Sequence, residues 1–257
     1  FAGDLLAQGI ATSFGISAYH IPLFGLYGAC STCGEALTVG AMTVAGGYAE
    51  HVVCVTSSHF GSAEKEFRFP LDYGNQRPLS ASWTVTGSGA FVLGKDQKCK
   101  AHITGMTPGR IVDYGLKDSM NMGACMAPAS VDTLERHFED FHVQPEEYDR
   151  IITGDLGSVG QTVLIDLLRE KGIDIADRHM DCGIEIFDAE AQDTHAGGSG
   201  CGCSAVTLSA YILPKLESGE WKKVLFLPTG ALLSKTSFNE GRSVPGIAHA
   251  VVLESPR

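Results

Sequence analysis

Two stretches of this chain are apolar around the whole circumference of a helix, and each follows a glycine-rich turn that contains a cysteine. The first stretch begins at Cys30 and ends near Gly46-Gly47, and the second begins at Cys201 and ends near Gly219. In the first, apolar side chains occupy every angular position: Ala36, Leu37, Val39, Ala41, Met42, Val44 and Ala45. A helix without a polar face is buried on both sides. The pattern therefore predicts two central, buried helices.

The same order of segments occurs twice along the chain. Each predicted helix is followed by a run of strand-forming residues, at 51–55 and at 223–227. The run FAGDLL at 1–6 is similar to ITGDLG at 152–157, and TVTGSGAFVL at 84–93 is similar to VPGIAHAVVL at 244–253. Similar segments in the same order indicate a duplicated unit, here a β-loop-α-β-β unit.

We therefore predict an α/β protein with two halves, residues 1–127 and 128–257, stacked in layers. The second half opens with an amphipathic helix at about 130–142, for which Ser130 is a plausible N-cap, followed by a helix at 160–171 that ends at Gly172. The segment 94–127 is weakly patterned and is interpreted as a connection. A strand is also predicted at 21–29. Because the chain opens within a strand, we expect the natural protein to carry a further N-terminal portion.

Composition and charge exclude some classes of protein. The chain has 19 Lys and Arg against 30 Asp and Glu, a net charge of −11, which disfavours a nucleic-acid-binding protein. Residues 5–34 contain no charged side chain, but polar residues and glycines interrupt the run. A membrane-spanning helix needs about 20 mostly apolar residues, so this run is interpreted as buried core. No basic region follows Phe1, so we expect no signal peptide.

The eight cysteines are interpreted mainly as reduced, buried thiols. A zinc site built from Cys30-X-X-Cys33 and Cys201-X-Cys203 is considered, but helix packing explains Cys33 and Cys203 more simply. Cys30 is the most informative of the eight because it lies at the start of a buried helix. The free N–H groups and the dipole there favour a thiolate or a bound anion. The alternative is a small structural cysteine.

Several motifs together resemble the thiolase/ketoacyl-synthase superfamily over the whole chain and, within it, most closely the stage V sporulation protein AD family. They are GACST at 28–32, TSSH at 56–59, EFRFP at 66–70, DYG with Gln76 at 72–76, TVTGSGA at 84–90, MAPA at 126–129, TGDL at 153–156, GGSGCGCSAV at 197–206 and TGALLS at 229–234. The resemblance implies a thiolase-like fold, in which duplicated βαβαβ halves form an α-β-α-β-α sandwich. Chains of the family carry about one more β-α portion at the N-terminus.

Condensing enzymes of the superfamily pair the cysteine with His and Asn, or with two His. At the matching positions this chain has Asp155 and Ser199. A carboxylate raises the pKa of a neighbouring thiol, and a serine is a weak oxyanion donor. We therefore interpret Cys30, Asp155 and Ser199 as a vestigial set and expect no catalytic residues. His195 or His249 could substitute if the alignment shifts.

The resemblance implies binding of dipicolinic acid (pyridine-2,6-dicarboxylate), either free or with calcium, in bacterial spores. The expected ligand-binding residues are Cys30, His59, Arg68, Thr86, Asp155 and Ser199. Arg77 is a further candidate, with surface ion pairing as the alternative for both arginines. No cofactor and no resident metal are expected.

The resemblance also implies a place for the protein in the cell. The expected partners are a second copy of the chain and the other stage V sporulation A membrane proteins, with the protein peripheral at the spore inner membrane. Two other functions stay open. One is a working acyltransferase that uses Cys30 as nucleophile, and the other is a structural scaffold or plug subunit with a vestigial pocket.

Overall fold

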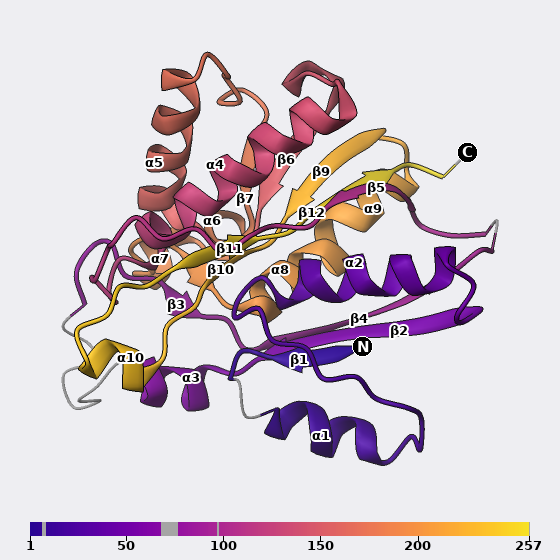
Figure 1. The fold of residues 1–257 in the computed structure, drawn as a ribbon, viewed down its shortest axis with the longest axis horizontal. Helices are drawn as coiled ribbons and strands as arrows, with labels where there is room; N and C mark the ends of the chain where they lie inside the picture. Colours follow the sequence, from indigo (N-terminus) through magenta and orange to yellow (C-terminus); the bar gives the residue numbers. More distant parts are fainter. Residues whose placement is uncertain (7–8, 68–76, 97, 257) are drawn as a thin grey trace.

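The computed structural model describes residues 1–6, 9–67, 77–96 and 98–256. Its elements are stacked in five layers (Figure 1), which confirms the predicted layered α/β architecture. The middle layer consists of two helices between two sheets. One is α2 (Thr32–Ala45), and the other is a continuous helical run built from α8 (Cys201–Thr207), a π-helical turn (Leu208–Ile212) and α9 (Leu213–Glu217).

The sheet below this layer has three strands in the order β1-β2-β4, with β1 parallel and β4 antiparallel to β2. They are β1 (Ala2–Asp4), β2 (His51–Ser58) and β4 (Gly87–Gly94). Helix α1 (Ile10–Ser17) lies outside this sheet. Strand β4 is the last strand of the sheet, so one of its edges has no neighbouring strand among the described residues.

The sheet above the central helices has five strands in the order β5-β12-β9-β6-β7. They are β5 (His102–Thr107), β12 (Ala250–Glu254), β9 (Lys223–Leu227), β6 (Arg150–Thr153) and β7 (His179–Asp181). Helices α4 (Met122–Phe141) and α5 (Gly157–Glu170) cover its outer face. One apolar core fills the space between the two sheets around α2 and α8, and a second lies between the five-stranded sheet and α4 and α5.

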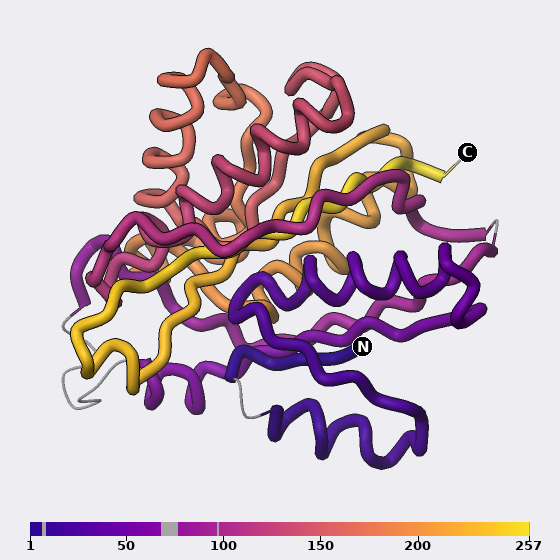
Figure 2. Tube along the Cα trace, in the orientation of Figure 1, coloured from indigo at the N-terminus to yellow at the C-terminus, as the bar shows by residue number. Residues whose placement is uncertain are grey.

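Short elements complete the fold and join the two halves. In one small sheet β3 (Trp83–Thr84) pairs in parallel with β8 (Gly198–Ser199), and in another β10 (Thr229–Ala231) pairs with β11 (Gly246–Ala248). The remaining helices are α3 (Phe60–Phe67), a 3-10 turn (Pro145–Glu147), α6 (Cys182–Glu185), α7 (Ala189–Gln192) and α10 (Lys235–Asn239). The path between them is clearest in the Cα trace (Figure 2).

Five predictions from the pattern were wrong in detail. Helix α4 begins at Met122 and is capped by Asn121, whose side chain accepts the Ala124 N–H at 3.3 Å. Ser130 is therefore a buried interior residue and not the cap. The early part of α4 was missed because it contains Pro128, which favours a helix start over a helix interior. Helix α5 begins at Gly157, ahead of the predicted Gly160.

The other three errors concern exposure and strand pairing. The C-terminal half of α2 is not enclosed on both sides, since Met42 is 50% exposed. The segment 21–29 forms only isolated bridges, such as that of Ala2 with Gly25, and no strand. Conversely, the connection interpreted as weakly patterned contains β5, which pairs with β12. Among the described helices, none combines the length and the apolar character that a bilayer crossing requires.

Helices α4 and α5 cross at two glycines, and this close approach gives a stability prediction. A Cβ atom at Gly160 would lie 2.8 Å from the Cα atom of Gly123, with backbone on both sides and no side chain that could move away. We expect Gly160→Ala to lower the free energy of unfolding by about 1–3 kcal/mol because the helices must separate. Urea titration measures the loss.

The control for this prediction is Gly15→Ala in α1. A Cβ atom at Gly15 meets no other atom within 4 Å. The same change there is expected to be neutral, or stabilising by up to about 1 kcal/mol, through the helix propensity of alanine. Equal effects of the two substitutions would contradict the close crossing.

Candidate functional site

Cys30 lies in a closed turn immediately before the central helix α2. Ala29 adopts a left-handed backbone conformation, with φ 52°, that turns the chain into the helix. The side chain of Thr32 secures the turn by accepting the Gly28 N–H at 3.0 Å and donating to the Ala29 carbonyl at 2.7 Å. Cys30 is only 4% exposed. The sequence interpretation of a buried cysteine at a helix start is confirmed.

Asp155 accepts hydrogen bonds from three other residues of the site and belongs to the turn between β6 and α5. Its Oδ2 atom accepts the Ser199 hydroxyl at 2.9 Å and the Gly200 N–H at 2.8 Å. Its Oδ1 atom accepts the Thr229 hydroxyl at 2.8 Å. Gly200 directly precedes α8, so the carboxylate occupies the position at the start of that helix where an external anion would otherwise bind.

The two halves meet where Cys30 faces Ser199. The Cys30 sulfur and the Ser199 Oγ lie 3.9 Å apart, and Ser199 in turn donates to Asp155. Burial raises the pKa of the Cys30 thiol well above its ordinary value, and the Asp155 carboxylate raises it further. Burial also raises the pKa of Asp155, although its hydrogen-bond donors oppose that shift. The arrangement thus favours a neutral thiol over a thiolate.

Helix α3 and the end of β2 close the site from the side of the first half. Ala63 of α3 packs with Cys30 and Cys201 in a small apolar cluster. Ser58 accepts the Gly202 N–H of α8 at 3.0 Å and donates to the Val85 carbonyl at 2.6 Å. The phenol of Tyr27 is also near, and burial together with Cys30 and Cys201 raises the pKa of Tyr27 to about 12.

The structure brings together three of the six predicted ligand-binding residues, namely Cys30, Asp155 and Ser199. His59 and Thr86 are exposed and lie where β2 and β3 end. Thr86 accepts the backbone N–H of Phe60, which follows His59. Neither contacts Cys30 within the described ranges. Arg68 lies outside the described residues.

The other basic candidates have structural partners. Arg77 is buried, stacks over Trp83 with its guanidinium carbon 3.5 Å from the ring centre, and donates to the Asp193 carbonyl at 2.8 Å. His195 contacts the Pro78 carbonyl at 3.0 Å, and His249 accepts the Gly109 N–H at 3.1 Å. Neither histidine contacts Cys30 in the part of the chain that the structure describes.

Sequence reasoning missed Thr229, Ser58 and Tyr27 as members of the site. Thr229 lies in the TGALLS motif and Ser58 in the TSSH motif, so both positions carried a family signal that was not assigned a role. As for metals, no three His, Cys, Asp or Glu side chains are grouped as ligands within the described residues. Cys33 and Cys203 belong to the apolar core between the sheets.

Comparison with known proteins identifies the relatives of this chain. The model of the family described as Stage V sporulation protein AD (SpoVAD) matches residues 1–254. The Stage V sporulation protein AD of Bacillus subtilis (strain 168) is 42% identical over 253 residues, which cover 98% of this chain and 74% of that protein.

Solved structures of low sequence identity share the fold. The tetronic acid condensing enzyme AbyA1 superposes with a TM-score of 0.62 at 14% identity, over 98% of this chain and 77% of the enzyme. Acat5 thiolase from Ascaris suum, solved with coenzyme A, gives a TM-score of 0.61 at 12% identity, over 99% and 86% of the two chains. The predicted thiolase-like fold is thereby confirmed.

Proposed function

This chain belongs to the stage V sporulation protein AD family. We propose that it binds dipicolinic acid at the Asp155 cluster, which consists of Cys30, Asp155, Ser199 and Thr229, and that it serves the uptake and release of that molecule by spores. The observation that carries the proposal is the buried junction of the two halves. There a thiol, two hydroxyl groups and a carboxylate converge beside the starts of α2 and α8. Convergent polar groups of this kind support the proposal of a site for a small ligand.

The same junction is poorly equipped for acyl transfer, and we propose that it is not catalytic. A nucleophilic cysteine needs a base that takes its proton or a charge that stabilises its thiolate. Here Cys30 contacts Ser199, and the nearby ionisable group is the Asp155 carboxylate, which disfavours a thiolate. The fold neighbours are condensing enzymes and thiolases, but that likeness concerns the fold alone.

Charge at the junction indicates which form of the ligand would bind. Dipicolinate is a dianion, and Asp155 already occupies the N–H group at the start of α8. Two negative groups in a buried site repel each other strongly. Binding therefore requires either a cation that travels with the ligand or a proton on Asp155. We propose the calcium chelate as the preferred form.

Calorimetric titration with dipicolinate, in the presence and absence of Ca²⁺, tests the proposal. We expect saturable binding that Ca²⁺ strengthens, and we expect Ser199→Ala or Cys30→Ala to weaken it about tenfold or more. Ser209→Ala, which removes an exposed hydroxyl on the same helical run, is the matched control and should not change the affinity.

Three outcomes would overturn the assignment. Absence of binding with and without Ca²⁺ would favour the scaffold or plug function. A stable acyl group on Cys30 after incubation with acyl-coenzyme A, detected as added mass, would favour the acyltransferase. Binding that Ser199→Ala and Cys30→Ala leave unchanged would place the ligand elsewhere.

We also propose that the chain forms a homodimer through the free edge of β4 and works with spore membrane proteins. The side chain of Val92 on this strand is 71% exposed. An unpaired strand with apolar side chains is a template for pairing with a second strand. Pairing two copies of β4 across a two-fold axis would join their three-stranded sheets.

A further inference from the structure

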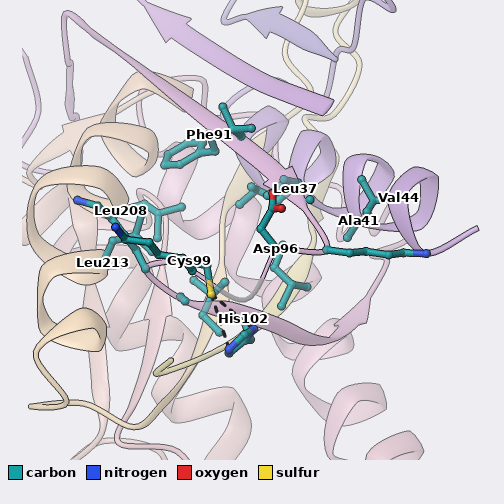
Figure 3. Close-up of a pocket in the computed structure, with 18 of the residues that line it drawn as sticks. Leu37, Ala41, Val44, Phe91, Asp96, Cys99, His102, Leu208 and Leu213 are labelled. Atoms are coloured by element: carbon teal, nitrogen blue, oxygen red, sulfur yellow. Dashed lines mark hydrogen bonds between the residues drawn. The ribbon is translucent and has the colours of Figure 1, made fainter. Parts of the chain in front are cut away.

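A cavity lies toward the opposite end of α2 from Cys30. Its volume is about 590 Å³, and it is bounded by α2 from Leu37 to Ala45, the end of β4, the segments 95–96 and 98–101, and the π-helical turn before α9. Figure 3 shows Leu37, Phe91 and Leu208 on its inner wall. None of Cys30, Asp155, Ser199 and Thr229 lines it, and its lining residue of α2 nearest in sequence to Cys30 is Leu37, seven residues or about 10 Å of helix away. The cavity is therefore distinct from the Asp155 cluster.

The inner wall of this cavity is apolar and belongs to the core. Leu37, Phe91 and Leu208 are each at most 9% exposed, and Leu253 of β12 is 4% exposed. The cavity thus opens into the space between the two sheets, where the side chains of α2 and the π-helical turn do not fill the layer. An apolar cavity of this size suits a hydrocarbon chain better than a polar metabolite.

The rim of the cavity is cationic, although the whole chain carries a net charge of −11. Lys95, Lys98 and Lys100 line it and are exposed. Lys100 lies 3.5 Å from Glu217, and the acidic rim residue Asp96 pairs with His51 at 2.8 Å. For Lys95 and Lys98 the described part of the chain provides no ion pair. An apolar interior with two available ammonium groups at its mouth is complementary to an anionic amphiphile.

We propose that this cavity binds a free fatty acid, with its chain along α2 against Phe91 and Leu208 and its carboxylate at Lys95 and Lys98. The ligand differs in class from the one proposed for the Asp155 cluster, and the two sites do not share a residue. Residues 90–94 of β4 also line the cavity, so its occupancy bears on the strand proposed for dimerisation.

Cys99 supplies a local reporter for this site. It lines the cavity beside His102, with its sulfur 3.6 Å from the His102 Nδ1 atom (Figure 3). Cys99 is partly exposed, whereas the other seven cysteines are buried. The rate at which iodoacetamide alkylates Cys99, measured by peptide mass spectrometry, therefore reports whether this cavity is occupied. It does not report on the Cys30 site, where the thiol is buried.

The experiment compares three ten-carbon ligands that differ in head group: decanoate, decanol and decyltrimethylammonium. We expect decanoate to slow Cys99 alkylation in a saturable way and to bind about tenfold more tightly than decanol, while the cationic ligand gives no protection. Replacing both Lys95 and Lys98 by Met should remove the preference for decanoate over decanol. Lys117→Met, an exposed lysine outside the cavity, is the matched control and should retain it.

A variant that fills the cavity provides a second test of the proposal. Ala41→Phe places a ring in the cavity from the wall of α2, and calorimetric decanoate binding should fall about tenfold or more. The proposal is overturned if decanoate fails to protect Cys99, if all three ligands protect it equally, or if Ala41→Phe leaves decanoate binding unchanged. Protection by phospholipid vesicles but not by free decanoate would likewise overturn it and assign the rim to a membrane surface.

Discussion

Replacing Asp181 by Ala is expected to lower the free energy of unfolding by about 3–5 kcal/mol. Asp181 is 1% exposed and its carboxylate accepts the Thr153 hydroxyl at 2.6 Å. The same carboxylate accepts the backbone N–H groups of Leu156 at 2.9 Å and Gly157 at 3.1 Å, at the start of α5. Alanine would leave these two backbone N–H groups without an acceptor, whereas the Thr153 hydroxyl would keep the Met180 carbonyl, 3.4 Å away. Each buried donor without a partner costs about 1–3 kcal/mol.

Urea titration of three variants tests this prediction. Asp181→Asn keeps one acceptor oxygen and should cost less than Asp181→Ala. Asp166→Ala is the matched control, because Asp166 is exposed on α5 and should change stability by less than about 0.5 kcal/mol. A loss below about 1 kcal/mol for Asp181→Ala would show that the turns at the starts of α5 and α6 do not depend on this carboxylate.

Asp181 also affects the site, because its carboxylate holds Leu156 and Gly157, which directly follow Asp155 in the turn between β6 and α5. The two carboxylates lie at the C-terminal ends of β7 and β6 and have different partners. Asp181 binds backbone donors within the second half, and Asp155 joins β6 to the start of α8 and to Thr229. Loss of the Asp181 hydrogen bonds should therefore also displace Asp155. In this architecture stability and the proposed ligand binding depend on one segment, from Thr153 to Gly157.

Much of the fold could be predicted because its signals are local and occur twice. The apolar helices after the two cysteine turns, and the strands that follow them, were visible in the pattern and are present in the structure. Strand β5 was missed because its run HITGMT has no clear alternation and gains its partner only through β12, far along the chain. The exposure of Met42 depends on what packs beside α2, which no local pattern contains.

The candidate site could be predicted only where the family motif assigned a role. Cys30 and Ser199 are separated by 169 positions, and their proximity followed from aligning the two repeated halves. Thr229 completes the Asp155 cluster through the bend between β9 and β10, and a threonine in such a run carries no distinctive signal. The apolar cavity beside Cys99 involves four separate segments and has no motif at all.

The buried histidine of α4 is expected to make the fold sensitive to acid. His137 is fully buried between the Thr107 hydroxyl, 2.8 Å from its Nδ1 atom, and the Tyr148 hydroxyl, 2.7 Å from its Nε2 atom. Burial, together with a smaller effect of the nearby Lys223, lowers the pKa of His137 from 6.5 to about 4. The unfolded chain thus binds a proton below pH 6.5 that the folded chain binds only near pH 4.

Because the pKa of His137 is lower in the folded protein than in the unfolded chain, acid lowers the free energy of unfolding. Stability from a neutral His137 is fully present above pH 6.5 and is lost as the pH falls toward 4, by about 1.4 kcal/mol per pH unit and about 3 kcal/mol in all. His137→Gln removes the titrating group, at a cost of about 1–2 kcal/mol at pH 7 through poorer hydrogen bonding. The variant should therefore be less stable than the natural chain at pH 7 and more stable at pH 4.

Urea titrations of both proteins at several pH values between 4 and 7 measure this reversal. Other titrating groups contribute equally to the two curves and cancel in their difference. His59→Gln, at an exposed position, serves as the control, and its difference curve should stay within about 0.5 kcal/mol. Parallel curves for His137→Gln and the natural chain would contradict the prediction, because they would mean that the imidazole has the same pKa in the folded and unfolded states. In that case the acid sensitivity would have to arise at other groups, such as His179 or His249, whose pKa values burial also lowers to about 4.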